Sequence, residues 1–96
     1  NKHAQMEKVL VQKYGRKAFD AMEDFRPYIG MPEGIVREYK LVMKDVNFHA
    51  YGFVRVEYGY KVYLPTQFFA TTASYINARF PRAIYTKNGK VAAIKW

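Results

Sequence analysis

Residues 50–64, AYGFVRVEYGYKVYL, decide the fold of this chain, because their side chains alternate with a period of two on both sides of a glycine. Ala50–Tyr58 forms the first alternating run, and Tyr60–Leu64 forms the second after Gly59. Alternation of this kind predicts two antiparallel strands that are joined by a tight turn. Pro65 ends the second run because proline cannot donate to a strand ladder.

Further strands are predicted on both sides of this hairpin. Ile35–Lys44 is rich in β-forming residues, and Lys44–Asn47 has the composition of a turn or bulge. We therefore expect residues 35–64 to form three sequential antiparallel strands. Ala83–Thr86 and Val91–Lys95 flank the segment Lys87–Lys90, in which Asn-Gly is a strong signal for a hairpin turn.

Two helices are predicted outside the strands. Residues 3–26 form an amphipathic pattern in which Gly15 marks either a kink or a break into two short helices, and Pro27 ends it. The apolar stripe of this pattern consists of Met6, Leu10, Tyr14, Ala18, Met22 and Phe25. Residues 27–34 form a loop by composition. Thr66 is placed to cap a second helix that extends to about Ala78.

The order of these elements is helix, three strands, helix, two strands. It resembles the element order of the OB-fold, and the resemblance does not extend to any sequence motif. The sequence thus predicts an α+β fold that is mainly β: a five-stranded OB-like Greek-key barrel over residues 35–96. An amphipathic N-terminal helix over residues 1–26 precedes the barrel, and both belong to one domain of 96 residues. An open α+β sheet with the same elements is the alternative.

Positive charge is concentrated in the second part of the chain. The formal net charge is +8, and the segment from Tyr58 to Trp96 contains six Lys/Arg, nine aromatic residues and no Asp or Glu. A positive field without local counter-charge attracts polyanions. Basic grooves with aromatic stacking platforms are typical of proteins that bind single-stranded nucleic acid. The sequence therefore predicts a non-specific single-strand-binding domain, without distinguishing DNA from RNA.

The alternation also predicts the binding face. If Val54, Val56, Val62 and Leu64 point inward, the residues between them point outward. Outward rings would stack on bases and outward cations would contact phosphates. With lysines from the first strand and the last hairpin, the predicted interface consists of Lys40, Lys44, Tyr51, Phe53, Arg55, Lys61, Tyr63, Lys87 and Lys90. In the alternative, Tyr51 and Phe53 pack under the N-terminal helix. Arg79 and Arg82 are interpreted as ordinary surface cations, and the alternative is that they add phosphate contacts.

No catalytic constellation is visible, so the chain is predicted to be a non-enzyme without metal or cofactor. His3 and His49 are the only imidazoles, and there is no Cys. One alternative is a small toxin-like ribonuclease that would use Arg55, Lys61, a tyrosine and His49. Another is a viral protein-interaction module that forms homo-oligomers through the N-terminal helix.

Composition also bears on the setting of the protein. No apolar run approaches the roughly 20 residues of a membrane span, and no signal-peptide pattern is visible. The absence of Cys fits an intracellular environment. We therefore expect an intracellular protein, in the nucleus or cytoplasm, that is not secreted and not bound to a membrane. A viral origin fits the same features.

Overall fold

The N-terminal region forms two helices. In the computed structural model, which describes residues 1–96, α1 spans Lys2–Tyr14 and α2 spans Arg16–Glu23. Gly15 separates them with φ 92° and ψ 158°, a backbone conformation that is essentially restricted to glycine. The side chain of Asn1 caps α1 by accepting from the backbone N–H of Ala4 at 2.8 Å. The predicted break at Gly15 is therefore confirmed.

A third helix replaces part of the first predicted strand. α3 spans Glu33–Glu38, so the prediction of extended structure from Ile35 is wrong for residues 35–38. Ile35, Val36 and Tyr39 are buried, which is a spacing that one face of a helix provides. What remains of the predicted strand is β1, Lys40–Val42, which pairs with β2, Asn47–His49, around a turn.

The main sheet has four antiparallel strands in sequential order. These are β3 (Tyr51–Glu57), β4 (Tyr60–Pro65), β5 (Ala83–Lys87) and β6 (Lys90–Lys95). Two-residue turns, Tyr58-Gly59 and Asn88-Gly89, join β3 to β4 and β5 to β6. All four turn residues have positive φ, as a type I′ turn requires. Both predicted hairpins are confirmed.

The remaining helix, α4, spans Gln67–Tyr75 between β4 and β5. Its N-cap is Thr66, whose hydroxyl group accepts from the backbone N–H of Phe69 at 3.4 Å. Phe69 and Ala73 are buried, and the ring of Phe69 lies 5.1 Å from that of Phe80 between their centroids. The predicted capped helix is confirmed, although it ends three residues earlier than expected.

The structure is an α+β fold with four helices and two antiparallel sheets, and it contains no closed barrel. β3 and β6 are the two edges of the main sheet and do not pair with each other. The predicted five-stranded OB-like barrel is therefore not confirmed, and the open sheet describes the chain. A barrel needs a long, bent first strand, and β1 has only three residues because α3 occupies the preceding segment.

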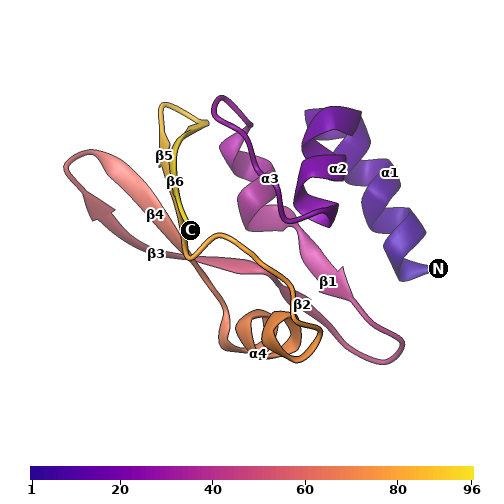
Figure 1. Ribbon diagram of the computed structural model, residues 1–96. Coiled ribbons are helices and arrows are strands. Elements are labelled where there is room, and N and C mark those ends of the chain that lie inside the picture. Colours follow the sequence, from indigo (N-terminus) through magenta and orange to yellow (C-terminus); the bar gives the residue numbers. More distant parts are fainter.

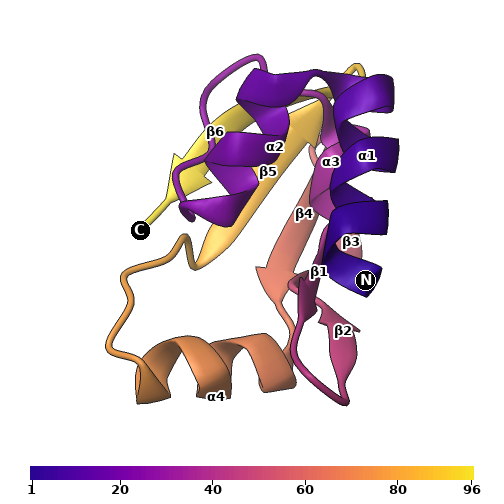
Figure 2. The same cartoon turned by 90° about the vertical axis from the view of Figure 1, so that its right-hand side faces the viewer.

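The helices cover one face of the main sheet. Figures 1 and 2 show α1, α2 and α3 together on one side of β3–β6, with α4 below the end of the sheet. A cluster of 16 buried apolar residues fills the space between these layers, and it includes Leu10, Phe19, Tyr63 and Ile84. The opposite face, which we call the open face, carries no helix. No helix of the structure is long and apolar enough to cross a membrane.

Candidate nucleic-acid interface

Two of the predicted stacking rings lie in the core. The side chains of Tyr51 and Tyr63 are 3% and 1% exposed, and both belong to the buried cluster beneath the helices. The hydroxyl group of Tyr51 donates to the carbonyl oxygen of Pro81 at 2.7 Å, and burial raises the pKa of Tyr51. A buried ring cannot stack on a base. The prediction that Tyr51 and Tyr63 point outward is wrong. The ring of Tyr51 packs against Phe69 of α4, with 5.5 Å between the centroids, and not against the N-terminal helix as the alternative proposed.

Phe53 is the partial exception among the predicted rings. It lies opposite Tyr63 in the β3–β4 ladder, with 5.8 Å between the ring centroids, and it is half exposed. Cross-strand partners share a face of a sheet. Phe53 therefore belongs to the helix-covered face, at its edge, rather than to a face that is open to a ligand.

Lys61 shares this covered face and has a counter-charge within the chain. Its Nζ lies 3.8 Å from Oε2 of the buried Glu33, and Nη1 of Arg37 lies 4.0 Å from the same oxygen. Tyr63 donates to that carboxylate at 2.5 Å. Burial raises the pKa of Tyr63, and the hydrogen bond to Glu33 adds to the rise. This network joins α3 to the sheet and gives Lys61 an acidic partner within the chain.

The open face carries a different pair of rings. Val62 lies between Arg55 on β3 and Tyr85 on β5, and Tyr85 in turn lies opposite Ala93 on β6. Tyr60 lies two residues from Val62 on β4 and therefore faces the same way. Tyr60 and Tyr85 are half-buried and sit on the two central strands. Alternation with the predicted inward residues Val62 and Leu64 would place Tyr60 in the interior, and this prediction is wrong.

The two rings line a shallow pocket near the hairpin tips. It has a volume of about 260 Å³ and is lined by Glu57, Tyr58, Tyr60, Tyr85, Ala92 and Ala93. The ammonium group of Lys87 lies 4.8 Å above the centroid of the Tyr60 ring. Lys87 and Lys90 are partners in the β5–β6 ladder, and neither has a carboxylate within 4.0 Å. Flat rings and unpaired cations therefore meet at one place.

A second basic cluster lies at the other end of β6. The guanidinium carbons of Arg26 and Arg79 lie 5.7 Å and 5.2 Å from the centroid of the Trp96 ring. Arg82 stacks on Phe80 at 4.3 Å, and its backbone N–H donates to the carbonyl oxygen of Lys95 at 2.7 Å. None of the basic side chains in this cluster forms an ion pair: Arg26, Arg79, Arg82 and Lys95.

The predicted basic strip is only partly assembled. Arg55 lies on the open face, but its Nε is bonded to Glu57 at 2.9 Å. Lys40 and Lys44 belong to the β1–β2 hairpin region, which Figure 1 shows at the opposite end of the molecule from the tips of β3–β4 and β5–β6. Lys87 and Lys90 are therefore the predicted cations that the structure brings beside exposed rings.

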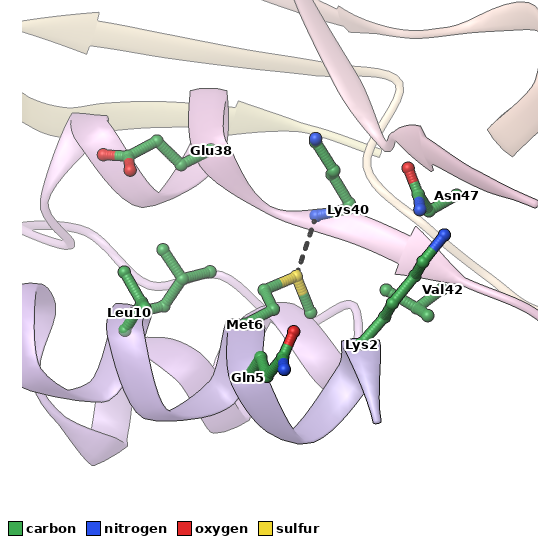
Figure 3. A pocket seen from close by; sticks show the side chains of 9 residues that line it. Lys2, Gln5, Met6, Leu10, Glu38, Lys40, Val42 and Asn47 are labelled. Atoms are coloured by element: carbon green, nitrogen blue, oxygen red, sulfur yellow. Dashed lines mark hydrogen bonds between the residues drawn. The ribbon is translucent and has the colours of Figure 1, made fainter.

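Lys40 instead borders a different pocket, between α1 and β1 (Figure 3). This pocket has a volume of about 340 Å³, and the backbone N–H of Lys40 donates to the sulfur of Met6 at 3.3 Å. Its one carboxylate, Glu38, already accepts hydrogen bonds from Tyr14 and Lys13. The lining thus offers two lysines, Lys2 and Lys40, but no aromatic ring on which a base could stack.

The residues that a ribonuclease would need are not brought together. Arg55 and Lys61 lie on opposite faces of the sheet, as their ladder partners Val62 and Thr86 show. His3 is bonded to Glu23 at 2.8 Å beside α2, whereas His49 lies exposed on β2. No group of three or more His, Cys, Asp or Glu is arranged to hold a metal ion.

The site residues that the sequence interpretation missed are Tyr60, Tyr85, Lys95, Arg26 and Trp96. All of them except Arg26 lie in the acid-free segment that begins at Tyr58. The composition of this segment indicates the region of the chain, but the predicted outward face of β4 is the face that the helices cover. Comparisons with protein-family models, with curated proteins and with solved structures found no match.

Proposed function

We propose that the protein binds single-stranded nucleic acid, with low sequence specificity, on the open face of its main sheet. One observation carries the proposal. Tyr60 and Tyr85 are half-buried on the two central strands and lie beside Lys87 and Lys90, which have no carboxylate partner. Four-stranded sheets with helices on one face and aromatic residues on the other commonly stack the bases of single strands.

The chemistry of the face supports a single strand rather than a duplex. Unstacked bases can enter a shallow apolar pocket and lie on tyrosine rings, whereas paired bases are stacked within a helix. Ring stacking contributes about 1–3 kcal/mol per base and tolerates any sequence, because every base has a π-face. Low specificity follows, since the pocket lining offers few hydrogen-bonding groups beyond the tyrosine hydroxyls and Glu57.

The charges indicate how the backbone of the strand would lie. Lys87 and Lys90 mark one end of β5–β6, and Lys95, opposite Ala83, marks the other end. Arg82, Arg79 and Trp96 continue beyond Lys95 in the second basic cluster. A strand that runs along β6 would place its bases toward Tyr60 and Tyr85 and its phosphates near these cations.

The competing proposal of an interaction through the N-terminal helix has less support. The apolar stripe of α1 and α2 is already used, because Leu10, Ala18, Phe19 and Met22 are buried against the rest of the chain. A helix whose apolar face is buried within its own chain exposes little apolar surface for an interface with a partner.

Fluorescence anisotropy with labelled single-stranded DNA, single-stranded RNA and duplex tests the proposal. Tyr60→Ala and Tyr85→Ala should each weaken single-strand binding by about 1–3 kcal/mol. Tyr75→Ala is the matched control, because Tyr75 is exposed on α4, away from the open face. Unchanged affinity in both sheet variants, or an equal loss in the control, would exclude the open face as the binding site.

A further inference from the structure

One edge strand of the main sheet, β6, is partly covered by another segment of the chain, and the other edge strand, β3, is not. Residues 30–32 cover the first half of the β6 edge: Gly30 donates to the carbonyl oxygen of Val91, and Val91 donates to that of Met31, both at 2.8 Å. β3 has no such cover. It pairs only with β4, and residues 53–57 form no backbone hydrogen bond outside that ladder. A free edge is a template for another strand.

The free edge exposes three large apolar side chains. Phe53, Val54 and Val56 are 51%, 49% and 63% exposed. Soluble proteins commonly protect an edge strand with lysines, with proline or with an inward charge. β3 has two such devices, the bulge between Phe53 and Arg55 and the charges of Arg55 and Glu57, but it has no lysine and no proline. Exposed apolar side chains beside unpaired peptide groups indicate a surface that a partner covers.

The peptide groups of Val56 point to this free edge. Glu57 and Tyr60 flank the two-residue turn, so their backbone groups face each other across the β3–β4 ladder. Because backbone groups alternate between the two edges along a strand, those of Val56 face away from β4. The strand therefore offers both an N–H and a C=O at Val56.

The charges on either side of Val56 are self-complementary. Arg55 and Glu57 both lie on the open face, and Nε of Arg55 is 2.9 Å from Oε2 of Glu57. If a second β3 ran antiparallel with Val56 opposite Val56, each Arg55 would lie opposite Glu57 of the second copy. A parallel, in-register partner would instead place like charges opposite each other, which is destabilising.

We propose that two copies of this chain form a dimer by antiparallel pairing of their β3 strands, with the two-fold axis at Val56. The two main sheets then form one continuous sheet of eight strands. A two-fold axis perpendicular to the sheet keeps both open faces on the same side of the dimer. The dimer rests on the geometry of the β3 edge and does not depend on the proposed function.

A mixing experiment tests this arrangement, with sedimentation velocity or light scattering on the full chain without nucleic acid. The wild type should dimerise in the micromolar range. Arg55→Glu places Glu opposite Glu across the axis, and Glu57→Arg places Arg opposite Arg. Each variant alone should dimerise at least about tenfold more weakly, because like charges oppose each other in the interface. An equimolar mixture of the two should recover the dimer, because each glutamate then lies opposite an arginine.

Val56→Pro is the second variant. It removes the N–H that points to the free edge without removing one from the β3–β4 ladder, so the monomer should stay folded and the dimer should be lost. Circular dichroism verifies folding of every variant. A wild type that remains monomeric at high micromolar concentration, or charge variants that remain monomeric when mixed, would overturn the proposed dimer.

Discussion

The hydroxyl group of Tyr63 donates a hydrogen bond to Oε2 of Glu33 across 2.5 Å, and this bond joins the centre of the main sheet to the first residue of α3. Both side chains are buried, and Arg37 and Lys61 approach the same carboxylate oxygen from the surface. The contact explains why a tyrosine, rather than a smaller apolar residue, occupies this position. Its ring fills the core and its hydroxyl group satisfies a buried carboxylate.

Tyr63→Phe should therefore destabilise the fold. The change keeps the ring but removes the donor to Glu33, and a buried acceptor that loses its partner costs about 1–3 kcal/mol. Urea unfolding at neutral pH measures the loss. Tyr85→Phe is the matched control, because the hydroxyl group of Tyr85 on the open face makes no hydrogen bond within the chain. The stability of this variant should equal that of the wild type within error. Equal stabilities of all three proteins would contradict a role for the Tyr63–Glu33 bond.

Truncation of two tyrosines on the same strand should separate the two faces of the sheet. Tyr63→Ala leaves a cavity in the core and should cost about 3–5 kcal/mol of unfolding free energy. Tyr60→Ala removes a half-buried ring from the open face, outside the core cluster, and should cost clearly less. Melting temperatures of the two variants provide the comparison. A larger loss for Tyr60→Ala would mean that the open face, and not the helix-covered one, is the core.

Acid stability should depend in part on the pair Tyr14–Glu38. The hydrogen bond from Tyr14 is the largest cause that lowers the pKa of Glu38, and Lys13 at 2.9 Å adds to it. A carboxyl group whose pKa is lower in the folded state stabilises the fold above its unfolded pKa of about 4.3. That contribution is lost as the pH falls through the folded pKa.

Tyr14→Phe should raise the pKa of Glu38 toward its ordinary value and reduce stability at neutral pH. The variant should then lose less stability than the wild type on acidification, because the lowered pKa of Glu38 contributes less to its stability at neutral pH. An NMR titration of the Glu38 side-chain carboxyl measures the pKa directly. The same titration of Tyr75→Phe, which removes a distant hydroxyl group, should give the wild-type value. A Glu38 pKa that does not move in Tyr14→Phe would refute the coupling.

Gly34 should be intolerant of alanine although it lies within a helix. Helix propensity alone predicts that Gly→Ala stabilises by about 1 kcal/mol. In the structure a Cβ atom at Gly34 would overlap the ring of Tyr14. We expect Gly34→Ala to destabilise by about 1–3 kcal/mol through this overlap. Gly52→Ala is the control, because its Cβ would meet only Cγ2 of Thr66 at 3.7 Å. Thermal unfolding of both variants decides between propensity and packing.

Binding to single strands should weaken steeply with salt if Lys87 and Lys95 contact phosphates. The slope of log K against log salt is about −0.7 for each neutralised phosphate on a single strand. Lys87→Ala and Lys95→Ala should each make the slope less negative by about this amount. Lys8→Ala, on the exposed side of α1, should leave it unchanged. Anisotropy titrations at several salt concentrations give the slopes, and a flat dependence for the wild type would exclude phosphate contacts.

Local features of the structure could be predicted because they depend on neighbouring residues. Asn88-Gly89 adopts the positive φ angles of its turn, Thr66 caps α4, and Gly15 separates two helices. Each of these outcomes follows from the conformational preferences of one or two side chains. The acid-free segment after Glu57 likewise indicated where unpaired positive charge would lie.

The candidate site was only partly predictable, because alternation shows that a strand has two different faces but not which one is buried. On β4, Tyr60 and Val62 lie on one face and Lys61 and Tyr63 on the other. Small β-branched residues suggested that the Val62 face was the interior. Val62 is buried too, but it lies outside the core cluster, to which the large rings of Tyr51 and Tyr63 belong.

The turns, the caps, the hairpins and the uneven charge can therefore be read from the amino-acid sequence, because they depend on residues that are near one another in the chain. The helix over residues 33–38, the open edges of the sheet, and the placement of Tyr60 and Tyr85 on the face without helices depend instead on tertiary contacts. The physical reason is that the helices must bury their apolar stripe against one face of the sheet. The side that they cover depends on contacts between segments that are distant in sequence.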